Sequence, residues 1–240
     1  ARCRDCDAIP KVADAGRVVL EGGKRVQVMH NGIRVLAGGY YGDWMTDIIS
    51  RLGGHHEPQE EIAFHEVMKH VGSNATMLEL GGFWSYYSLW FLAGSNTRRS
   101  IVLEPDPNHL EVGLKNAELN AKSIEFVHAS IGERSLSRCP FQTESAGEIL
   151  IRQVSVPDLL EEKGVGYLDI LHADTQGAET GIIASCEDLL RSGRIGFCIV
   201  STHSHHIGGD VLKHQKCLAM LREFGGRILV EHDVQESFSG

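Results

Sequence analysis

The ten residues TMLELGGFWS, at positions 76–85, decide the fold of this 240-residue chain. The apolar run 77–80 predicts a short buried strand, and the glycine pair after it predicts a tight turn into a helix over residues 84–93. Glycines at such a turn let the backbone approach a ligand closely, although the G-x-G-x-x-G form is absent. The segment therefore predicts the start of a ligand-binding α/β fold, with an ordinary tight turn as the alternative.

Strands and helices alternate along the rest of the chain. Apolar runs predict strands at 101–103, 124–127, 167–171, 196–200 and 227–230. The segments between and after them predict helices at 107–120, 156–163, 178–191 and 209–224, with a hairpin excursion at 135–155. Strands separated by helices of roughly 10–15 residues predict an α/β fold, with a mostly parallel sheet and helices on both faces. Ligands of such sheets bind at the carboxyl ends of the strands, so we expect functional side chains directly after the strands.

The N-terminal region has a different pattern. Residues 17–36 alternate apolar and polar around Asn31-Gly32, which predicts a β-hairpin or a three-stranded meander. A short helix is predicted over 40–54, and Pro58 begins the next helix. We expect residues 1–56 to form a small addition, either a substrate lid or a packed cap, and residues 57–240 to form the main domain. The candidate substrate contacts in the addition are Tyr41, Trp44, His55 and His56.

Charge and composition exclude some classes of partner. The 23 basic and 32 acidic residues give a net charge of −9, which disfavours nucleic acid because its binding depends on neutralising phosphates. No apolar run reaches the roughly 18–20 residues that span a bilayer, and no signal peptide is visible. Four of the six cysteines are predicted to be buried thiols, typical of the cytoplasm, where we expect the protein. Cys3 and Cys6 form C-x-x-C without a second pair nearby, so no metal is predicted there.

Acidic residues stand at the ends of the predicted strands. Glu104 ends the second strand of the main domain, 25 residues after Glu79 ends the first. A carboxylate at this point is placed to accept both ribose hydroxyls of a nucleoside cofactor. Asp174 ends the fourth strand and is expected in the same crevice, with an N-cap of the following helix as the alternative.

Residues 57–235 resemble the FkbM-type methyltransferases, a family of class I enzymes that use S-adenosylmethionine (SAM). The resemblance rests on five segments in the family's order: Glu79-Leu80-Gly81-Gly82, Tyr86-Tyr87-Ser88, Glu104-Pro105-Asp106-Pro107, Leu119-Asn120 and Gln176-Gly177-Ala178-Glu179. The chain departs from the family's pattern at Phe83 (usually asparagine), Ser85 (usually glycine) and Gln176 (usually glutamate). Class I folds usually end with a seventh, antiparallel strand, which we expect to be missing here or lost from a shortened sequence.

The resemblance implies a Rossmann-like class I methyltransferase fold that binds SAM. Glu79 and Gly81 would lie near the methionine part, Glu104 would hold the ribose, and residues 128–131 would line the adenine. Asp174 would sit beside the methyl group and the acceptor. The implied cofactor-binding residues are Glu79, Gly81, Gly82, Ser85, Tyr86, Glu104, Asp106, Ala129, Ser130 and Asp174.

Histidines follow the fifth strand of the main domain and suggest the chemistry. His203 is the candidate general base that would take a proton from an acceptor hydroxyl, with Asp174 as the second catalytic residue. The alternatives are a divalent metal on Asp174, His203 and Glu179, which we do not favour, and a plain polar loop. Further acceptor contacts are predicted at Gln176, Glu179 and His205.

The predicted function is methylation of oxygen on a small molecule, such as a sugar or a natural-product hydroxyl. The alternatives are a non-catalytic binding module for SAM or another small molecule, and an NAD-dependent oxidoreductase, whose usual glycine loop is absent. A small-molecule acceptor is the expected partner, without nucleic acid or membrane, and a homo-oligomer is left open.

Overall fold

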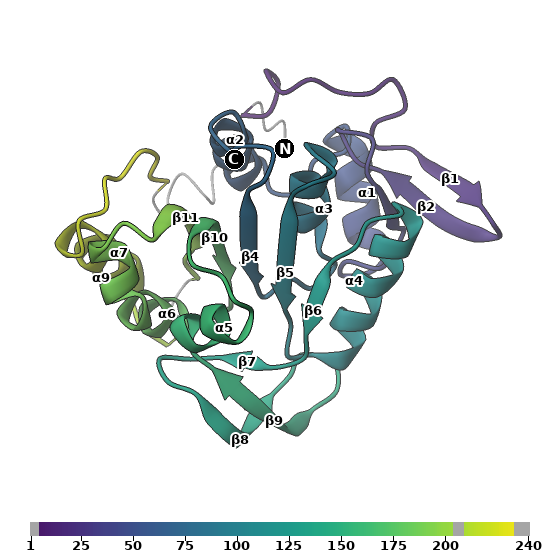
Figure 1. Cartoon of the computed structure of the whole chain (residues 1–240). Helices are drawn as coiled ribbons and strands as arrows, with labels where there is room; N and C mark the ends of the chain where they lie inside the picture. The colour runs from purple at the N-terminus through teal and green to yellow at the C-terminus, as the bar shows by residue number, and fades with distance from the viewer. Residues whose placement is uncertain (1–4, 204–208, 233–240) are drawn as a thin grey trace.

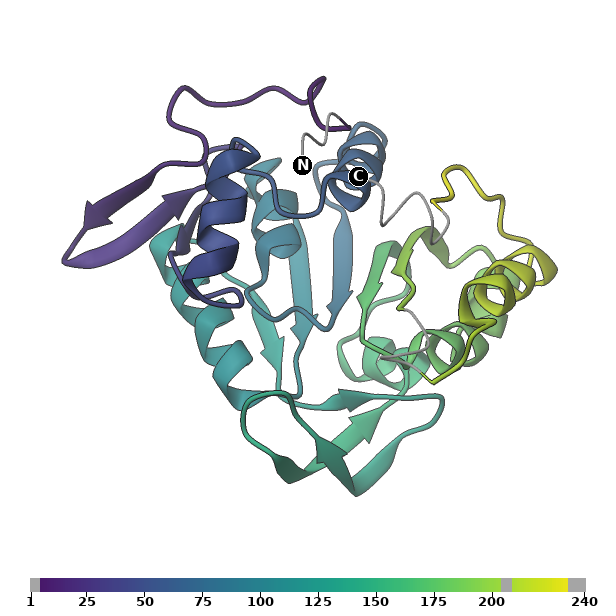
Figure 2. The same ribbon diagram turned by 180° about the vertical axis from the view of Figure 1, so that it is seen from behind.

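The computed structural model describes residues 5–203 and 209–232 of the chain. Its N-terminal part is an antiparallel sheet of order β1-β2-β3 followed by two helices. The elements are β1 (Val18–Glu21), β2 (Lys24–Val28), β3 (Arg34–Leu36), α1 (Asp43–Arg51) and α2 (Pro58–Met68). The predicted three-stranded meander is confirmed, and the β1–β2 hairpin projects from the molecule beside α1 (Figures 1 and 2).

A parallel sheet of five strands forms the centre of the molecule, in the order β11-β10-β4-β5-β6. The strands are β4 (Thr76–Leu80), β5 (Arg99–Leu103), β6 (Glu125–Val127), β10 (Leu168–Asp174) and β11 (Ile195–Ser201). The helices between and after them are α3 (Tyr86–Ala93), α4 (Pro107–Leu119), α5 (Val156–Glu162), α6 (Glu179–Ser185), α7 (Glu187–Arg191) and α9 (Lys213–Glu223). The chain leaves β4 first toward β5 and later returns to its other side as β10, so a topological switch point lies between β4 and β10.

The predicted hairpin excursion is confirmed as a third, small sheet. It has the order β7-β9-β8, from β7 (Ser130–Ile131), β8 (Leu136–Gln142) and β9 (Glu148–Val154). Figure 1 shows this sheet below the ends of β4 and β5. Asp106, which caps α4, accepts hydrogen bonds from the Ser145 N–H (2.7 Å) and hydroxyl (2.6 Å). This pair of bonds holds the hairpin tip beside the carboxyl end of β5.

Two apolar cores lie on opposite faces of the central sheet, because successive side chains of a strand point to opposite faces. Met77 packs with Phe64 of α2 and Phe91 of α3, whereas its neighbour Leu78 packs with Leu159 of α5. The first core also contains Met29, Ile33, Val35 and Ile49 of the N-terminal part. The N-terminal part therefore shares a core with the sheet.

Two expected elements differ in the structure. Residues 227–230 do not form the predicted strand: Leu229 and Val230 are 58% and 49% exposed, and this apolar run lies on the surface and pairs with no strand of residues 5–203 or 209–232. The helix predicted over 178–191 is divided at Cys186, whose ψ of 3° leaves the helical conformation. Within the described ranges, no helix is both long and apolar enough to cross a bilayer.

Candidate functional site

A cavity of about 490 Å³ lies at the carboxyl ends of β4, β5 and β10. This volume is within the range of about 300–1,000 Å³ that is typical of small-ligand and cofactor pockets. Its wall comes from the N-terminal part, the strand ends and the hairpin tip. The lining comprises residues 40–41, 56–57, 81–84, 103–106, 141–144 and 174–178, with Glu79, Tyr87, His109, Ile131 and His172.

The glycine turn brings three strand ends together. Gly81 has φ +76°, and a Cβ atom on it would lie 1.8 Å from the carbonyl oxygen of Asp174. A Cβ atom on Gly82 would lie 2.3 Å from Cγ1 of Val102, and the Gly81 N–H donates to the carbonyl of Leu103 at 2.9 Å. Both glycines line the cavity, but their close packing against β5 and β10 would require glycine even without a ligand.

Phe83 and Ser85, which depart from the family's usual residues, both have left-handed backbones, with φ of +37° and +60°. Asparagine and glycine, the usual residues there, adopt this conformation most readily. Phe83 and Ser85 therefore adopt a left-handed backbone conformation that is less favourable for them than for asparagine and glycine. The Phe83 ring stacks on His109 with centroids 3.5 Å apart, whereas the buried Ser85 hydroxyl has no hydrogen-bond partner among the described residues.

Replacing Ser85 with glycine is expected to raise the free energy of unfolding by about 1 kcal/mol, because the change relieves a left-handed backbone and removes an unpartnered buried hydroxyl. Urea denaturation measures the difference. Ser192, whose φ is −84°, provides the matched control, since Ser192→Gly gains no such relief and is expected to leave stability unchanged or lower. A loss of stability in Ser85→Gly would contradict the explanation.

Glu104 presents a carboxylate to the cavity at the end of β5. One of its oxygens accepts a hydrogen bond from the Phe83 N–H (2.9 Å), and the other accepts one from the Asp106 N–H (2.8 Å). The residue is only 4% exposed, and burial raises the pKa of Glu104 to about 7. Two backbone donors thus fix the orientation of the carboxylate, and each oxygen keeps a lone pair for a ligand.

Glu79, at the end of β4, is bonded to the next helix. Its carboxylate accepts hydrogen bonds from the N–H (3.0 Å) and the hydroxyl of Ser88, and burial raises the pKa of Glu79 to about 7. The Tyr87 side chain also lines the cavity, and its buried hydroxyl has no hydrogen-bond partner among the described residues. A ligand in the cavity is one source of the missing partner.

Asp174 joins His203 and Glu179 in one network. His203 contacts Asp174 Oδ1 through Nε2 (3.1 Å) and Glu179 Oε1 through Nδ1 (3.0 Å). Burial opposes the charged form of His203, but the two carboxylates outweigh burial and raise its pKa to about 10. Lys213 Nζ lies 3.0 Å from the other oxygen of Glu179, so an ammonium occupies the place that a metal ion on Glu179 would need. Both nitrogens of His203 are engaged, which argues against a free base.

Three carboxylates gather beside the cavity, and two of them, Glu57 and Asp174, line it. Oxygens of Glu57, Glu60 and Asp174 lie within 4.8 Å of one another. Each is paired with a histidine, at 3.3 Å for Glu57–His56, 2.8 Å for Glu60–His172 and 3.1 Å for Asp174–His203. Burial acts to lower the pKa of His56, but the opposite effect of Glu57 and Glu61 is larger and raises this pKa to about 10. The histidines thus supply positive charge that offsets the carboxylates.

One side of the cavity is closed by residues from three distant segments. The Tyr41 hydroxyl lies 3.3 Å from both carboxylate oxygens of Glu144 at the hairpin tip, and it accepts a hydrogen bond from Gln176 Nε2 at 3.1 Å. Deeper in the wall, Tyr40 stacks on Trp84 with ring centroids 4.4 Å apart. The N-terminal part therefore forms one wall of the cavity.

The structure brings half of the predicted site residues to the cavity. Nine line it: Tyr41, His56, Glu79, Gly81, Gly82, Glu104, Asp106, Asp174 and Gln176. Eight others do not: Trp44, His55, Ser85, Tyr86, Ala129, Ser130, Glu179 and His203. His205 lies outside the described residues.

The eight residues outside the lining have identifiable positions. Ser85, Tyr86, Ala129 and Ser130 are fully buried in the protein, and the Tyr86 hydroxyl accepts a hydrogen bond from Asn31 instead of facing the cavity. Trp44 is 58% exposed on α1, and His55 belongs to a separate buried cluster. His203 contacts the lining residue Asp174, and Glu179 accepts a hydrogen bond from the N–H of the lining residue Gly177 at 2.9 Å.

Sequence reasoning missed several lining residues. The hairpin tip 141–144 is not at the end of a strand of the central sheet, so the topological rule gives it no role. His172 had a usable signal, because residues two apart on a strand share a face and Asp174 was already predicted. Tyr40, Trp84 and Tyr87 form an aromatic wall of the cavity and were not among the predicted site residues.

The sheet order, the glycine turn and the acidic strand ends define the class: a class I methyltransferase fold. In agreement, the methyltransferase domain of METTL16 (crystal form 2) superposes with a TM-score of 0.50 at 16% identity, over 83% of this chain and 77% of that one. A precorrin-6y C5,15-methyltransferase from Geobacter metallireducens GS-15 gives a TM-score of 0.46 at 13% identity, over 69% and 71%. At these identities the likeness concerns the fold alone.

The sequence itself identifies the family. The family model described as the methyltransferase FkbM domain matches residues 66–228, more than half of the chain. The chain therefore belongs to the FkbM methyltransferase domain family, as its motifs predicted, and its class is that of the SAM-dependent methyltransferases. Among curated proteins no sequence match was found.

Proposed function

We propose that the cavity binds SAM and that the protein transfers the methyl group to a hydroxyl of a small-molecule acceptor. Glu104 carries the proposal. Its carboxylate is buried, lines the cavity and is held by two backbone N–H groups, so it presents two oriented acceptors side by side. The two adjacent hydroxyls of a ribose match this arrangement.

The rest of the cavity has suitable chemistry for the other parts of SAM. Ile131 and Phe141 supply apolar surface for a nucleobase near Glu104. Glu57 and Asp174, which also line the cavity, carry carboxylates that offset the positive charges of an ammonium and a sulfonium. Bound SAM supplies an electrophilic methyl group.

Asp174 is our candidate for the residue that contacts the acceptor. Its side chain is 28% exposed, and only one of its oxygens is hydrogen-bonded to His203. We assign Asp174 the task of orienting the acceptor hydroxyl and accepting its proton as the oxygen takes the methyl group. His203 then acts as a positioning residue that holds Asp174, in place of the base role predicted from the sequence. Alignment of the two reacting groups supplies much of the rate.

A small acceptor with an oxygen nucleophile fits the walls best. The bonds between Tyr41, Glu144 and Gln176 close one side of the cavity, which favours a small acceptor over an extended one. Aromatic rings of Tyr40 and Trp84 offer flat apolar surface of the kind that packs against a sugar or a natural-product ring.

Calorimetry with SAM and with its demethylated product tests the cofactor. We expect saturable binding of both at one site per chain, and no binding of NAD. Absence of binding by either compound at millimolar concentration would refute the proposal, and binding of NAD instead would favour an oxidoreductase. Turnover against a panel of hydroxyl and amine acceptors then separates O-methylation from N-methylation. Binding without turnover on any acceptor would favour a non-catalytic module.

A further inference from the structure

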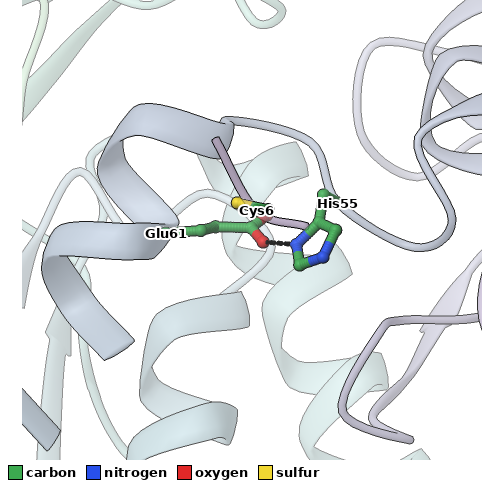
Figure 3. A group of neighbouring side chains, drawn as sticks. All are labelled: Cys6, His55 and Glu61. Atoms are coloured by element: carbon green, nitrogen blue, oxygen red, sulfur yellow. Dashed lines mark hydrogen bonds and ion pairs between the residues drawn. The ribbon is translucent and has the colours of Figure 1, made fainter. Parts of the chain in front are cut away.

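Four side chains of the types that bind metal ions meet where the first 55 residues of the chain pack against α2, and none of them lines the cavity. Cys6 precedes β1, His30 lies between β2 and β3, His55 precedes α2, and Glu61 lies in α2. Their exposed fractions are 5%, 1%, 1% and 0%. Figure 3 shows Cys6, His55 and Glu61 pointing toward one another from three different segments.

The distances suit a single ion. Cys6 Sγ, a ring nitrogen of His55 and a carboxylate oxygen of Glu61 all lie within 4.8 Å of one another. His30 Nε2 lies 3.7 Å from Glu61 Oε2, the same oxygen that contacts His55 Nδ1. Ligand atoms of a tetrahedral zinc ion are about 3.3–3.8 Å apart for bonds of about 2.0–2.3 Å. Small side-chain movements therefore convert this cluster into a four-ligand site.

His30 provides an independent indication of a cation-binding site. Its Nδ1 lies 3.4 Å from the carbonyl of Pro10, which fixes the proton on that nitrogen. The buried Nε2 has no hydrogen-bond partner among the described residues, and its lone pair faces the carboxylate of Glu61. A lone pair beside a carboxylate is repulsive unless a cation lies between them.

The surroundings match those of a structural metal site. Ligating histidines usually donate their second N–H to a carbonyl, as His30 does to Pro10, and ligating carboxylates are themselves hydrogen-bonded. Glu61 Oε1 accepts such bonds from the N–H (2.9 Å) and Nδ1 (2.7 Å) of His56. One sulfur, two imidazole nitrogens and one carboxylate oxygen form a donor set typical of zinc. A thiolate and a carboxylate also balance the charge of a divalent ion, which a buried site requires.

We propose that Cys6, His30, His55 and Glu61 bind one zinc ion that fastens the N-terminal part to α2. All four positions of the ion are then filled by protein, so its role is structural and it takes no part in the reaction. Because Glu61 also holds His56, a lining residue of the cavity, the ion stabilises one wall of the site. Sequence patterns did not indicate this site because the partners of Cys6 lie 24 to 55 positions away from it.

Cobalt substitution of the purified chain tests the donor set. Chelated protein is titrated with Co²⁺ in the absence of oxygen, and the optical spectrum is recorded. We expect saturation at one ion per chain, with the intense visible bands of tetrahedral cobalt and a near-ultraviolet thiolate-to-cobalt band. Cys6→Ser is expected to lose the thiolate band, whereas Cys139→Ser, in the hairpin, is expected to keep it. No saturable binding, or a thiolate band that survives in Cys6→Ser, overturns the proposal.

Thermal unfolding provides a second measurement that does not depend on the cysteine. Zinc is expected to raise the Tm of chelated wild-type protein by more than about 5 °C, since it binds the folded chain alone. His30→Gln is expected to abolish most of this rise, and His70→Gln, at an exposed position in the turn after α2, is expected to preserve it. An equal rise in all three proteins places the ion elsewhere and overturns the proposal, as does the absence of any rise in wild type.

Discussion

Replacing Glu104 with glutamine is expected to weaken SAM binding about 100-fold at pH 8. The carboxylate offers two charged acceptors to two hydroxyls, and charge-assisted hydrogen bonds of this kind each contribute about 1.5–3 kcal/mol. Glutamine keeps one acceptor, removes the charge and turns an N–H₂ group toward the backbone N–H of Phe83 or Asp106. Calorimetric titration with SAM measures the change in Kd.

The pH dependence of SAM binding distinguishes this explanation from simple misfolding. Burial raises the pKa of Glu104 to about 7, so below that pH the ligand-free carboxyl is mostly protonated. Ribose hydroxyls donate to the ionised form, so SAM binding lowers this pKa and expels the proton. We therefore expect wild-type affinity to weaken as pH falls below 7, by up to about tenfold per pH unit. At pH 6, close to one proton should be released per SAM bound.

Controls assign the released proton to Glu104. Titrations in two buffers of different ionisation enthalpy measure proton release, and Glu104→Gln should release about one proton fewer than wild type. Glu79, whose pKa burial also raises to about 7, is present in both proteins and cancels in this difference. Glu111→Gln, on an exposed part of α4, should match wild type in Kd and proton release. A Kd for Glu104→Gln within about threefold of wild type would remove the main support for the proposed cofactor site.

Replacing Asp174 with asparagine is expected to lower kcat about 100-fold or more while leaving the Kd for SAM within about threefold of wild type. The amide no longer accepts a proton from the acceptor hydroxyl, and loss of such catalysis typically costs about 10²- to 10⁴-fold. Turnover is measured with the best acceptor from the panel, and Asp188→Asn, on the exposed surface of α7, is the matched control. Equal loss of kcat and SAM affinity would indicate a cofactor-binding role instead.

The pH dependence of kcat, measured in the same assay, decides between the two roles considered for His203. As a positioning residue it acts in its charged form, which its two carboxylate partners maintain because they raise its pKa to about 10. The rate should then be flat from about pH 7 to pH 9 and fall as pH rises through 10, and His203→Ala should lose less kcat than Asp174→Asn. A general base acts in its neutral form, so log kcat would instead rise with unit slope up to about pH 10.

The sheet was predictable because its strands are short runs with apolar residues and all of them except β6 are followed by a helix, a pattern that few folds accommodate. The one predicted strand that failed, residues 227–230, shows the limit: apolar residues at a surface give the same local signal as a buried strand. Glu104 and Asp174 were found because strand ends meet at one edge of a parallel sheet. That rule places a residue near a site but does not say whether its side chain points there. Tyr87 lines the cavity, whereas its neighbour Tyr86 is buried and does not.

Contacts between distant segments were the part that the sequence did not reveal. His203 looked like a free base because its neighbours Asp174 and Glu179 come from other strands and helices. Glu144 and Phe141 reach the cavity only because Asp106 holds the hairpin tip through Ser145. In each case a hydrogen bond between residues more than 20 positions apart fixed the role, and local periodicity contains no information about such bonds.

The wall contributed by the N-terminal part bears on how acceptor preference can diverge within the family. Tyr40, Tyr41, His56 and Glu57 line the cavity but lie before residue 66, where the match to the family model begins. Glu104 and Asp174 lie inside the matched region. Under the proposed function, residues inside the matched region bind the methyl donor, and we expect the stretch 40–57 ahead of it to contact the acceptor. For redesign, grafting residues 40–57 from one relative to another is the smallest exchange expected to transfer acceptor choice.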